Sequence, residues 1–167
     1  MAEDRRGNGQ SAAADPAPDG TEQLIVQAQY VKDLSFENPR APQSLMQPGG
    51  PPEVQIGVDV KARNLGPETF EVLLSINASA KAGGEPVFIV ELAYGAVVAV
   101  KGASEASLTN LVLVETPRVI FPFARAIIAD ATRDGGFPPL LINPIDFAEL
   151  MRRNQQAMTA GGSPPVV

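Results

Sequence analysis

The sequence of 167 residues contains no cysteine and no histidine. Without cysteine, the chain cannot form disulfides, thiolate nucleophiles or cysteine-ligated zinc sites. Without histidine, it lacks the commonest general base and the commonest ligand of transition metals. Tryptophan is also absent, and aromatic residues make up only 5% of the chain. Because 44% of the residues are hydrophobic, a core is still expected, built mainly from Val, Ile, Leu and Ala.

Positive charge is scarce as well. The chain has 13 Lys and Arg residues against 19 Asp and Glu, which gives a net charge of -6. This balance argues against binding to nucleic acid or to anionic membrane surfaces, since both require clustered basic residues. No apolar run approaches the roughly 18 residues of a membrane helix, and the polar start Met1–Arg6 does not resemble a signal peptide. We therefore expect a cytoplasmic protein with neutral or basic partners.

Motifs of catalysis are missing too. The sequence has no G-x-S-x-G motif, no P-loop and no calcium loop. Two carboxylate pairs, Glu68 with Glu71 and Asp146 with Glu149, are candidates for acid–base chemistry, but solvated surface charge explains them better. The sequence therefore predicts neither an enzyme nor a bound cofactor or metal.

The ends of the chain differ in composition from its middle. Residues 1–21 are rich in Gly, Ala, Ser, Asp and Pro, and are predicted to form a disordered tail. Residues 159–167, with two glycines and two prolines, are predicted to form a second, flexible tail. This leaves one folded domain at 22–158, a length that suits a single core.

Strands with one buried face are predicted in the middle of the chain. In Glu53–Lys61 and Phe70–Lys81, apolar and polar residues alternate with a period of two. A turn is expected between them at Arg63–Pro67, and a hairpin at Ala82–Gly84, because both segments carry glycine at a break in the alternation. The pattern is typical of an antiparallel sheet.

A third strand, Val87–Val100, is apolar on both faces. Such a strand is usually covered on both faces. The rest of the chain has few residues left to cover its second face. This pattern indicates association between subunits. A fourth, mixed strand is predicted at Gln23–Val31, and the proline-rich segment Asn38–Pro52 is predicted to be a crossing or flexible connection.

The last third of the chain is predicted to be helical. One helix is expected to begin near Pro122 and to end at Asp134–Gly136. A second is expected to begin at Asn143–Pro144, with asparagine as its N-cap and proline in the first position. Apolar residues at helical spacing support the first helix; they are Val119, Ile120, Phe123, Ala124, Ile127 and Ile128.

Two segments have residue patterns that the formation of a strand or a helix does not fully explain. In Lys32–Glu37, two acidic residues bracket two apolar ones directly after a strand. This is either a strand end with a phenylalanine in the core, which the composition alone favours, or an acidic docking patch. The other segment combines Pro117–Arg125 with Gly136–Leu140, a helix with a buried face followed by a proline-rich connector.

These segments resemble the SecB family of bacterial export chaperones, in one order from about Ile25 to Arg152. The matching pieces are Tyr30–Pro39, Pro52–Val54, Tyr94–Gly95, Phe121–Arg125, Gly136–Leu140 and Pro144–Phe147. The resemblance implies an α+β fold in which each subunit has a four-stranded antiparallel sheet with helices packed on one side. It also implies a homotetramer, built as a dimer of dimers.

The resemblance implies a function as well. Such proteins keep precursor polypeptides unfolded in the cytosol without nucleotide and deliver them to the ATPase SecA. By position, SecA binding is implied for Asp33, Glu37, Ile89 and Glu91. Carboxylates around an apolar spot suit a basic, metal-bearing tail on the partner, and any zinc there would belong to SecA.

The resemblance also points to a client-binding groove near the sheet and the long crossing connection. Its candidate residues, for which ordinary core packing is the alternative role, are Val54, Ile56, Val58, Phe70, Phe88 and Phe137. The sequence departs from the family pattern at Gly49–Pro51, where relatives often have a tryptophan, and its tails lack a strongly acidic end.

Two other kinds of binding protein fit the same residues. One is a small-ligand module with a helix over a curved antiparallel sheet, which a pocket closed to peptides would favour. The other is a structural adaptor for one folded partner. Prevention of aggregation of several unrelated unfolded proteins distinguishes a chaperone from both.

Overall fold

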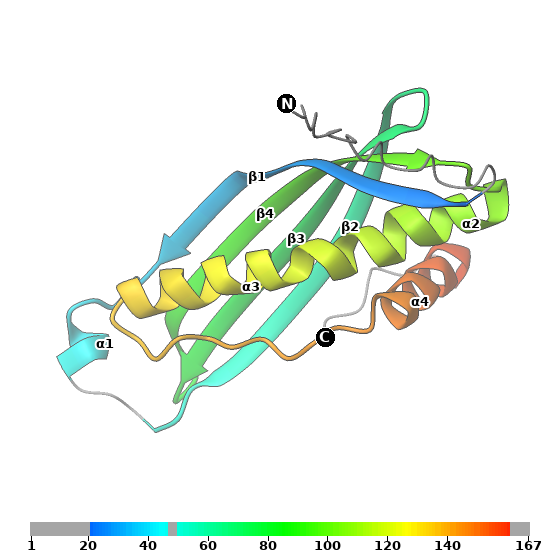
Figure 1. The fold of residues 1–167 in the computed structure, drawn as a ribbon. Coiled ribbons are helices and arrows are strands. Elements are labelled where there is room, and N and C mark those ends of the chain that lie inside the picture. Colours follow the sequence, from blue (N-terminus) through cyan, green and yellow to red (C-terminus); the bar gives the residue numbers. More distant parts are fainter. Residues whose placement is uncertain (1–20, 47–49, 161–167) are drawn as a thin grey trace, which may run out of the picture.

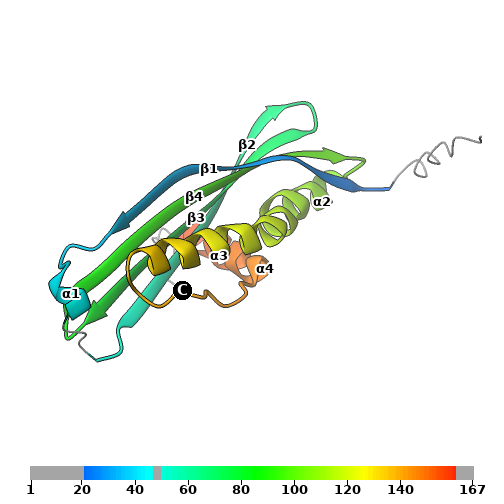
Figure 2. The ribbon, with the colours of Figure 1, turned by 60° about the vertical axis from the view of Figure 1, so that its left-hand side comes forward.

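A computed structural model of the chain describes residues 21–46 and 50–160. Four strands form one antiparallel sheet in the order β1-β4-β3-β2, and the helices lie on one of its faces (Figure 1, Figure 2). The predicted α+β class is therefore confirmed. The strands are β1 (Gln23–Glu37), β2 (Glu53–Gly66), β3 (Thr69–Ala82) and β4 (Glu85–Lys101). The helices are α1 (Gln43–Met46), α2 (Glu105–Asn110), the π-helical η1 (Leu111–Glu115), α3 (Thr116–Asp134) and α4 (Phe147–Ala160).

The period-two alternation of the central strands has the predicted effect. In β3, alternate residues from Val72 to Ala80 are buried against the helices, while their neighbours are half-buried or exposed. The hairpin to β4 turns at Gly83 and Gly84, whose positive φ angles of 59° and 83° suit glycine. The turn before β3 lies later than predicted, at Pro67–Glu68, because β2 keeps pairing with β3 as far as Gly66.

β4 is an inner strand of the sheet, paired with β1 on one side and β3 on the other. Its helix-facing residues are buried, including Val90, Leu92 and Val98. No described helix covers the opposite face, which we call the helix-free face, and Ile89 is half-buried there. β1 is longer than predicted and runs to Glu37, so the acidic segment is part of the sheet.

The predicted start of the first helix near Pro122 is wrong. Helical structure begins at Glu105, where the Ser104 Oγ caps the chain by accepting the N–H of Ser107 at 3.2 Å. It continues through η1 into α3, whose second residue is Pro117. A proline lacks the N–H for the α-helical bond, and a π turn accommodates that loss. Pro122 therefore sits inside α3, on its exposed side.

The predicted start of the second helix at Asn143–Pro144 is also wrong. Those residues are extended, and α4 begins only at Phe147. The cap is supplied by Asp146, whose Oδ1 accepts the N–H of Glu149 at 3.0 Å. α4 runs to Ala160, two residues into the predicted C-terminal tail. The rest of that tail, and residues 1–20 of the predicted N-terminal tail, lie outside the described residues.

The core lies between the sheet and α3. Ile120, Ala124 and Ile128 form a fully buried stripe along the helix, with Phe147 of α4 against it. Thr132 then positions the chain that returns beside α3. Its Oγ1 donates to a backbone carbonyl of α3 and accepts the N–H of Leu140 at 2.9 Å. None of the helices that the structure describes is long and apolar enough to span a membrane.

A polar network on the helix-free face joins side chains of β1, β2 and β3 across β4. Glu71 of β3 accepts a hydrogen bond from the Tyr30 hydroxyl and lies 3.1 Å from Lys32 Nζ and 2.8 Å from Arg63 Nη2. Tyr30 reaches across β4 because Gly95 leaves room: a Cβ there would lie 2.5 Å from the ring. Glu71 is thus a structural carboxylate, only 11% exposed, and not the solvated charge that the sequence predicts.

These partners lower the pKa of Glu71 from its ordinary value of 4.5 to about 2, chiefly through the hydrogen bond from Tyr30 and then that from Lys32. A depressed pKa means that the charge stabilises the fold above about pH 4.5. That stability is lost as the pH falls toward 2. We therefore expect Glu71→Gln to lower the thermal unfolding midpoint by several degrees at pH 7, because a charge-assisted hydrogen bond contributes about 1.5–3 kcal/mol.

The difference between Glu71→Gln and the parent chain should shrink steadily between pH 4.5 and pH 2. Circular dichroism melts across this range measure it. Glu68→Gln is the matched control, since Glu68 lies three residues away in an exposed turn. A midpoint difference that stays constant with pH would contradict this role for Glu71.

Candidate binding surfaces

Two hollows lie side by side along the inner face of the edge strand β2. The first has a volume of about 510 Å³ and lies where the crossing connection, the start of β2, the start of β4 and the chain after α3 meet. The described residues that line it are mostly apolar, and Arg40 is the one charged side chain among them. The lining residues are Arg40, Ser44, Gly50, Pro51, Pro52, Val54, Ala82, Val87, Phe88, Phe137, Pro138, Pro139 and Leu140.

The second hollow, about 310 Å³, lies farther along β2 and is closed by the extended chain before α4 and by α4 itself. Its lining residues are Ile56, Val58, Ile142, Asn143, Pro144, Ile145, Asp146, Glu149, Leu150 and Arg153. Alternate residues of β2 therefore serve both hollows: Val54 lines the first, and Ile56 and Val58 line the second. We call the two hollows together the groove.

Five of the six predicted groove residues line the groove. Val54, Phe88 and Phe137 belong to the first hollow, and Ile56 and Val58 to the second. Phe70 lines neither, because its position at the start of β3, paired with Val98, is toward the other end of the sheet.

Of the lining residues that the sequence did not assign to the groove, the longest continuous stretch is 138–140 with 142–145. The proline-rich connector after Gly136 was the sequence feature that could have indicated this stretch. The sequence analysis noted the connector but did not assign it to the groove.

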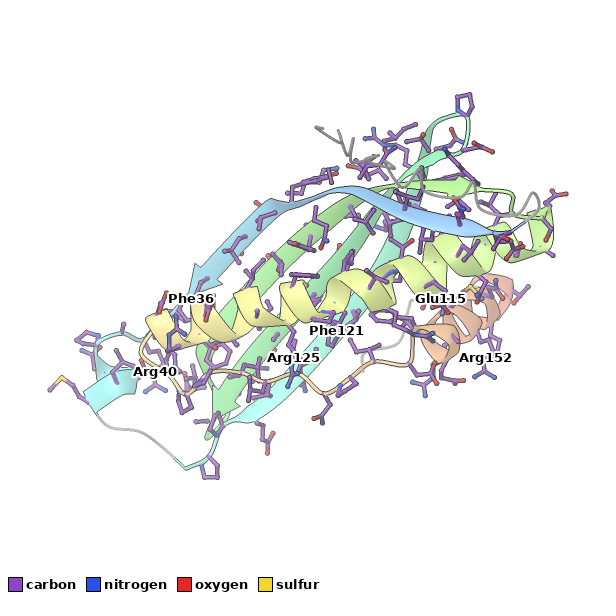
Figure 3. All side chains as sticks on the ribbon, in the orientation of Figure 1. Phe36, Arg40, Glu115, Phe121, Arg125 and Arg152 are labelled. Carbon is purple, nitrogen blue, oxygen red and sulfur yellow. The ribbon has the colours of Figure 1, made fainter. Side chains whose placement is uncertain are left out.

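Three phenylalanines form a cluster beside the first hollow. The ring centroid of Phe36 lies 6.0 Å from that of Phe88 and 6.4 Å from that of Phe137, and the latter two are 5.2 Å apart. The Phe36 ring packs against Gly135, where an added Cβ would lie 2.2 Å from its Cζ. We call Phe36, Phe88 and Phe137 the aromatic cluster. Figure 3 shows Phe36 at the end of β1, next to the C-terminal end of α3.

The four predicted partner-docking residues lie together on the helix-free face. In the antiparallel register, Glu37 is opposite Ile89, Ser35 is opposite Glu91, and Asp33 is two residues before Ser35. Residues directly opposite in this way have Cβ atoms about 4.5–5.5 Å apart. Asp33, Glu37 and Glu91 are exposed, and none takes part in an ion pair within residues 21–46 and 50–160. We call Asp33, Glu37, Ile89 and Glu91 the acidic patch.

Neither surface brings together groups that a covalent reaction would need. Among the described residues, no group of three or more Asp and Glu side chains could hold a metal ion. Asp146 and Glu149 border the groove, but Asp146 caps α4 and Glu149 pairs with Arg152 and Arg153 at 2.6 and 3.0 Å. An apolar groove and a separate acidic patch are surfaces suited to non-covalent binding.

Comparison with known proteins gives the family. The family model described as preprotein translocase subunit SecB matches residues 17–158. A protein-export protein SecB from Bradyrhizobium diazoefficiens is 51% identical, over 93% of this chain and 95% of the relative. Another from Maricaulis maris is 48% identical, over 90% of this chain and 87% of the relative. The chain belongs to the SecB family, and its role is that of a protein-export chaperone.

A solved structure shares the fold at low sequence identity. It is a SecB-like chaperone of Mycobacterium tuberculosis in complex with a ChAD peptide from an antitoxin. Its TM-score to this chain is 0.61 at 16% identity, with 73% of this chain and 90% of that chain covered. The four-stranded sheet with helices on one face is thus an arrangement that both proteins have.

Proposed function

We propose that the chain is a holdase that binds unfolded precursor polypeptides in the groove and keeps them competent for export. It acts by binding alone, without catalysis and without a nucleotide, in the cytoplasm. It then delivers the bound precursor to SecA through the acidic patch. Several copies of the chain assemble into a homotetramer, a dimer of dimers.

The observation that carries this proposal is the position of the groove beside an edge strand. β2 is at the end of the sheet, so its outer backbone groups pair with no other described strand. Val54 is 37% exposed at the first hollow, which leaves apolar surface open to a second chain. An extended polypeptide can place apolar side chains in the hollows and add backbone hydrogen bonds to the edge. Such binding places weak demands on client sequence.

Docking to SecA is supported by the charge and composition of the acidic patch. Three carboxylates that form no ion pair with a described residue surround the half-buried Ile89, and the neighbouring surface of β3 and β4 is mostly small and polar. Complementary charge steers a basic partner to this face and fixes its register, while an apolar contact at Ile89 adds burial. The patch and the groove lie on opposite faces of the sheet, so both can be occupied together.

Self-assembly is supported by apolar surface that one subunit leaves open. On α3, Val119 and Phe123 are 45% and 52% exposed and lie one turn apart, on the side that does not face the sheet. On the edge strand β1, Ile25, Val31 and Leu34 are also exposed. A second copy of the chain would cover an unpaired strand edge and an apolar helix face of this kind.

The first hollow also has the size of a small-molecule pocket, since such pockets range from about 300 to 1,000 Å³. A small-ligand binding module is therefore the second candidate function. The two candidates differ in what they do to an unfolded protein: a holdase suppresses its aggregation, and a small-ligand module does not.

Multi-angle light scattering of the full chain, alone and with an unfolded protein, tests the proposal. Alone, we expect a mass of four times the 17.5 kDa of one chain. With alkylated, permanently unfolded α-lactalbumin, we expect a stable complex of higher mass. Turbidity assays should show suppressed aggregation of several unrelated denatured proteins without ATP. A monomer that binds no unfolded protein would contradict both parts of the proposal.

A further inference from the structure

The acidic patch and the groove are separated by the thickness of one sheet. Neighbouring residues of β1 point to opposite faces: Glu37 belongs to the acidic patch, and Phe36 belongs to the aromatic cluster. The same holds on β4, where Ile89 belongs to the patch and Phe88 lines the first hollow. Because Glu37 is opposite Ile89 in the register, the two pairs lie side by side. A shift of the end of β1 therefore affects both surfaces.

Phe36 is the contact through which such a shift would reach the groove. Its ring packs on Phe88 and Phe137, two walls of the first hollow. It is held from the other side by Gly135 at the end of α3, with no space for even a Cβ. A packed cluster of this kind does not deform continuously, so a displaced ring must repack its neighbours.

The backbone makes a second connection between the same two surfaces. Directly after Glu37, the chain turns at Asn38, whose Oδ1 accepts a hydrogen bond from the Ser44 hydroxyl at 2.9 Å. Ser44 and Arg40 both line the first hollow. Upstream, the register of β1 shifts between Val31 and Asp33, which separates the end of the strand from the rest. The segment 33–44 thus contributes residues to both surfaces.

We propose that Phe36 is a positioning residue that couples the acidic patch to the groove. Occupation of the patch moves the end of β1, Phe36 repacks the aromatic cluster, and the first hollow holds an unfolded segment less tightly. By linkage, an occupied groove weakens docking at the patch by the same factor. This inference rests on the proposed function and adds to it the residue through which docking releases a client.

The experiment measures the affinity of the full chain for fluorescein-labelled, alkylated α-lactalbumin, with and without saturating SecA from the same organism. In the parent chain, SecA should raise the dissociation constant about fivefold or more, the lower end of typical couplings. We call the dissociation constant with SecA divided by that without SecA the ratio. In Phe36→Ala this ratio should fall close to one. Gly135→Ala should lower it as well, because the added methyl group displaces the ring without removing it.

Leu65→Ala is the matched control, since Leu65 is an exposed apolar residue of β2 that lies outside the groove, the aromatic cluster and the acidic patch. It should keep the parent ratio, and Phe36→Leu should keep part of it. Gly135→Ala and Phe36→Leu also keep the test valid if Phe36→Ala does not fold. A parent ratio of one, or a parent-like ratio in Phe36→Ala and Gly135→Ala, would overturn the coupling.

Amide hydrogen exchange gives a readout that does not depend on SecA. Binding of the unfolded protein should change the exchange rates of residues 33–37 in the parent chain and in Leu65→Ala, but not in Phe36→Ala. Unchanged rates in the parent chain despite tight binding would overturn the coupling and leave client binding intact. Failure of SecA or of the unfolded protein to bind the parent chain would instead overturn the proposed function at that surface.

Discussion

Val54→Lys is expected to weaken binding of an unfolded protein about tenfold or more. Val54 lines the first hollow, is partly exposed, and faces a site whose one charged side chain, Arg40, has the same sign as the new lysine. The lysine would therefore find no partner in the hollow and would have to be desolvated by an incoming apolar segment. Desolvation of an unpaired polar group costs about 1–3 kcal/mol, and 1.4 kcal/mol is a factor of ten in affinity.

Fluorescence anisotropy with the labelled unfolded protein measures this effect. The matched control is Gln55→Lys, which adds the same charge to the next residue of β2, on the opposite face of the strand. Both variants should melt close to the parent chain, because both positions are exposed. Equal affinities for the Val54 and Gln55 variants would show that clients are not bound at this hollow.

The double charge reversal Glu37→Lys with Glu91→Lys is expected to weaken SecA binding at least tenfold. The two carboxylates flank Ile89 on adjacent strands, so a basic partner would meet two like charges in place of two opposite ones. Juxtaposed like charges at an interface cost several kcal/mol. The effect should diminish as salt is raised, because these side chains are exposed and are screened by ions.

Isothermal titration calorimetry at moderate salt measures this loss, and anisotropy should show that client binding without SecA is unchanged. Glu68→Lys is the control, since it reverses an exposed charge at the turn between β2 and β3, outside the acidic patch. If the double variant bound SecA as the parent chain does, the acidic patch would not be the docking site.

Much of the sheet could be predicted from the sequence because strand patterning is a local signal. The alternation in Glu53–Lys61 and Phe70–Lys81 reports which residues face the core, and the glycine pair Gly83–Gly84 reports a tight turn. The two apolar faces of Val87–Val100 predicted a strand covered on both sides, and the described helices cover one side of β4.

The predicted helix starts were wrong because several nearby residues could each cap the same helix, and the sequence does not show which one does. Both Asn143–Pro144 and Asp146 satisfy the rules for an N-terminus. Packing of Ile142 and Ile145 along the groove keeps that stretch extended and leaves the cap to Asp146. In the same way, Pro122 looked like a helix start because a proline inside a helix is costly, but Ser104 and the π turn had already begun the helix.

The sequence by itself determined the antiparallel sheet, the apolar character of its covered face, the acidic balance of charge and the family. All of these reside in residue types and short-range order. Only the tertiary structure decided which residues share a surface. Strand register placed Glu37 beside Ile89, and the path of the chain after α3 closed the groove over Val54, while Phe70 was left outside it. Register and crossing depend on contacts between residues far apart in sequence, which no local pattern contains.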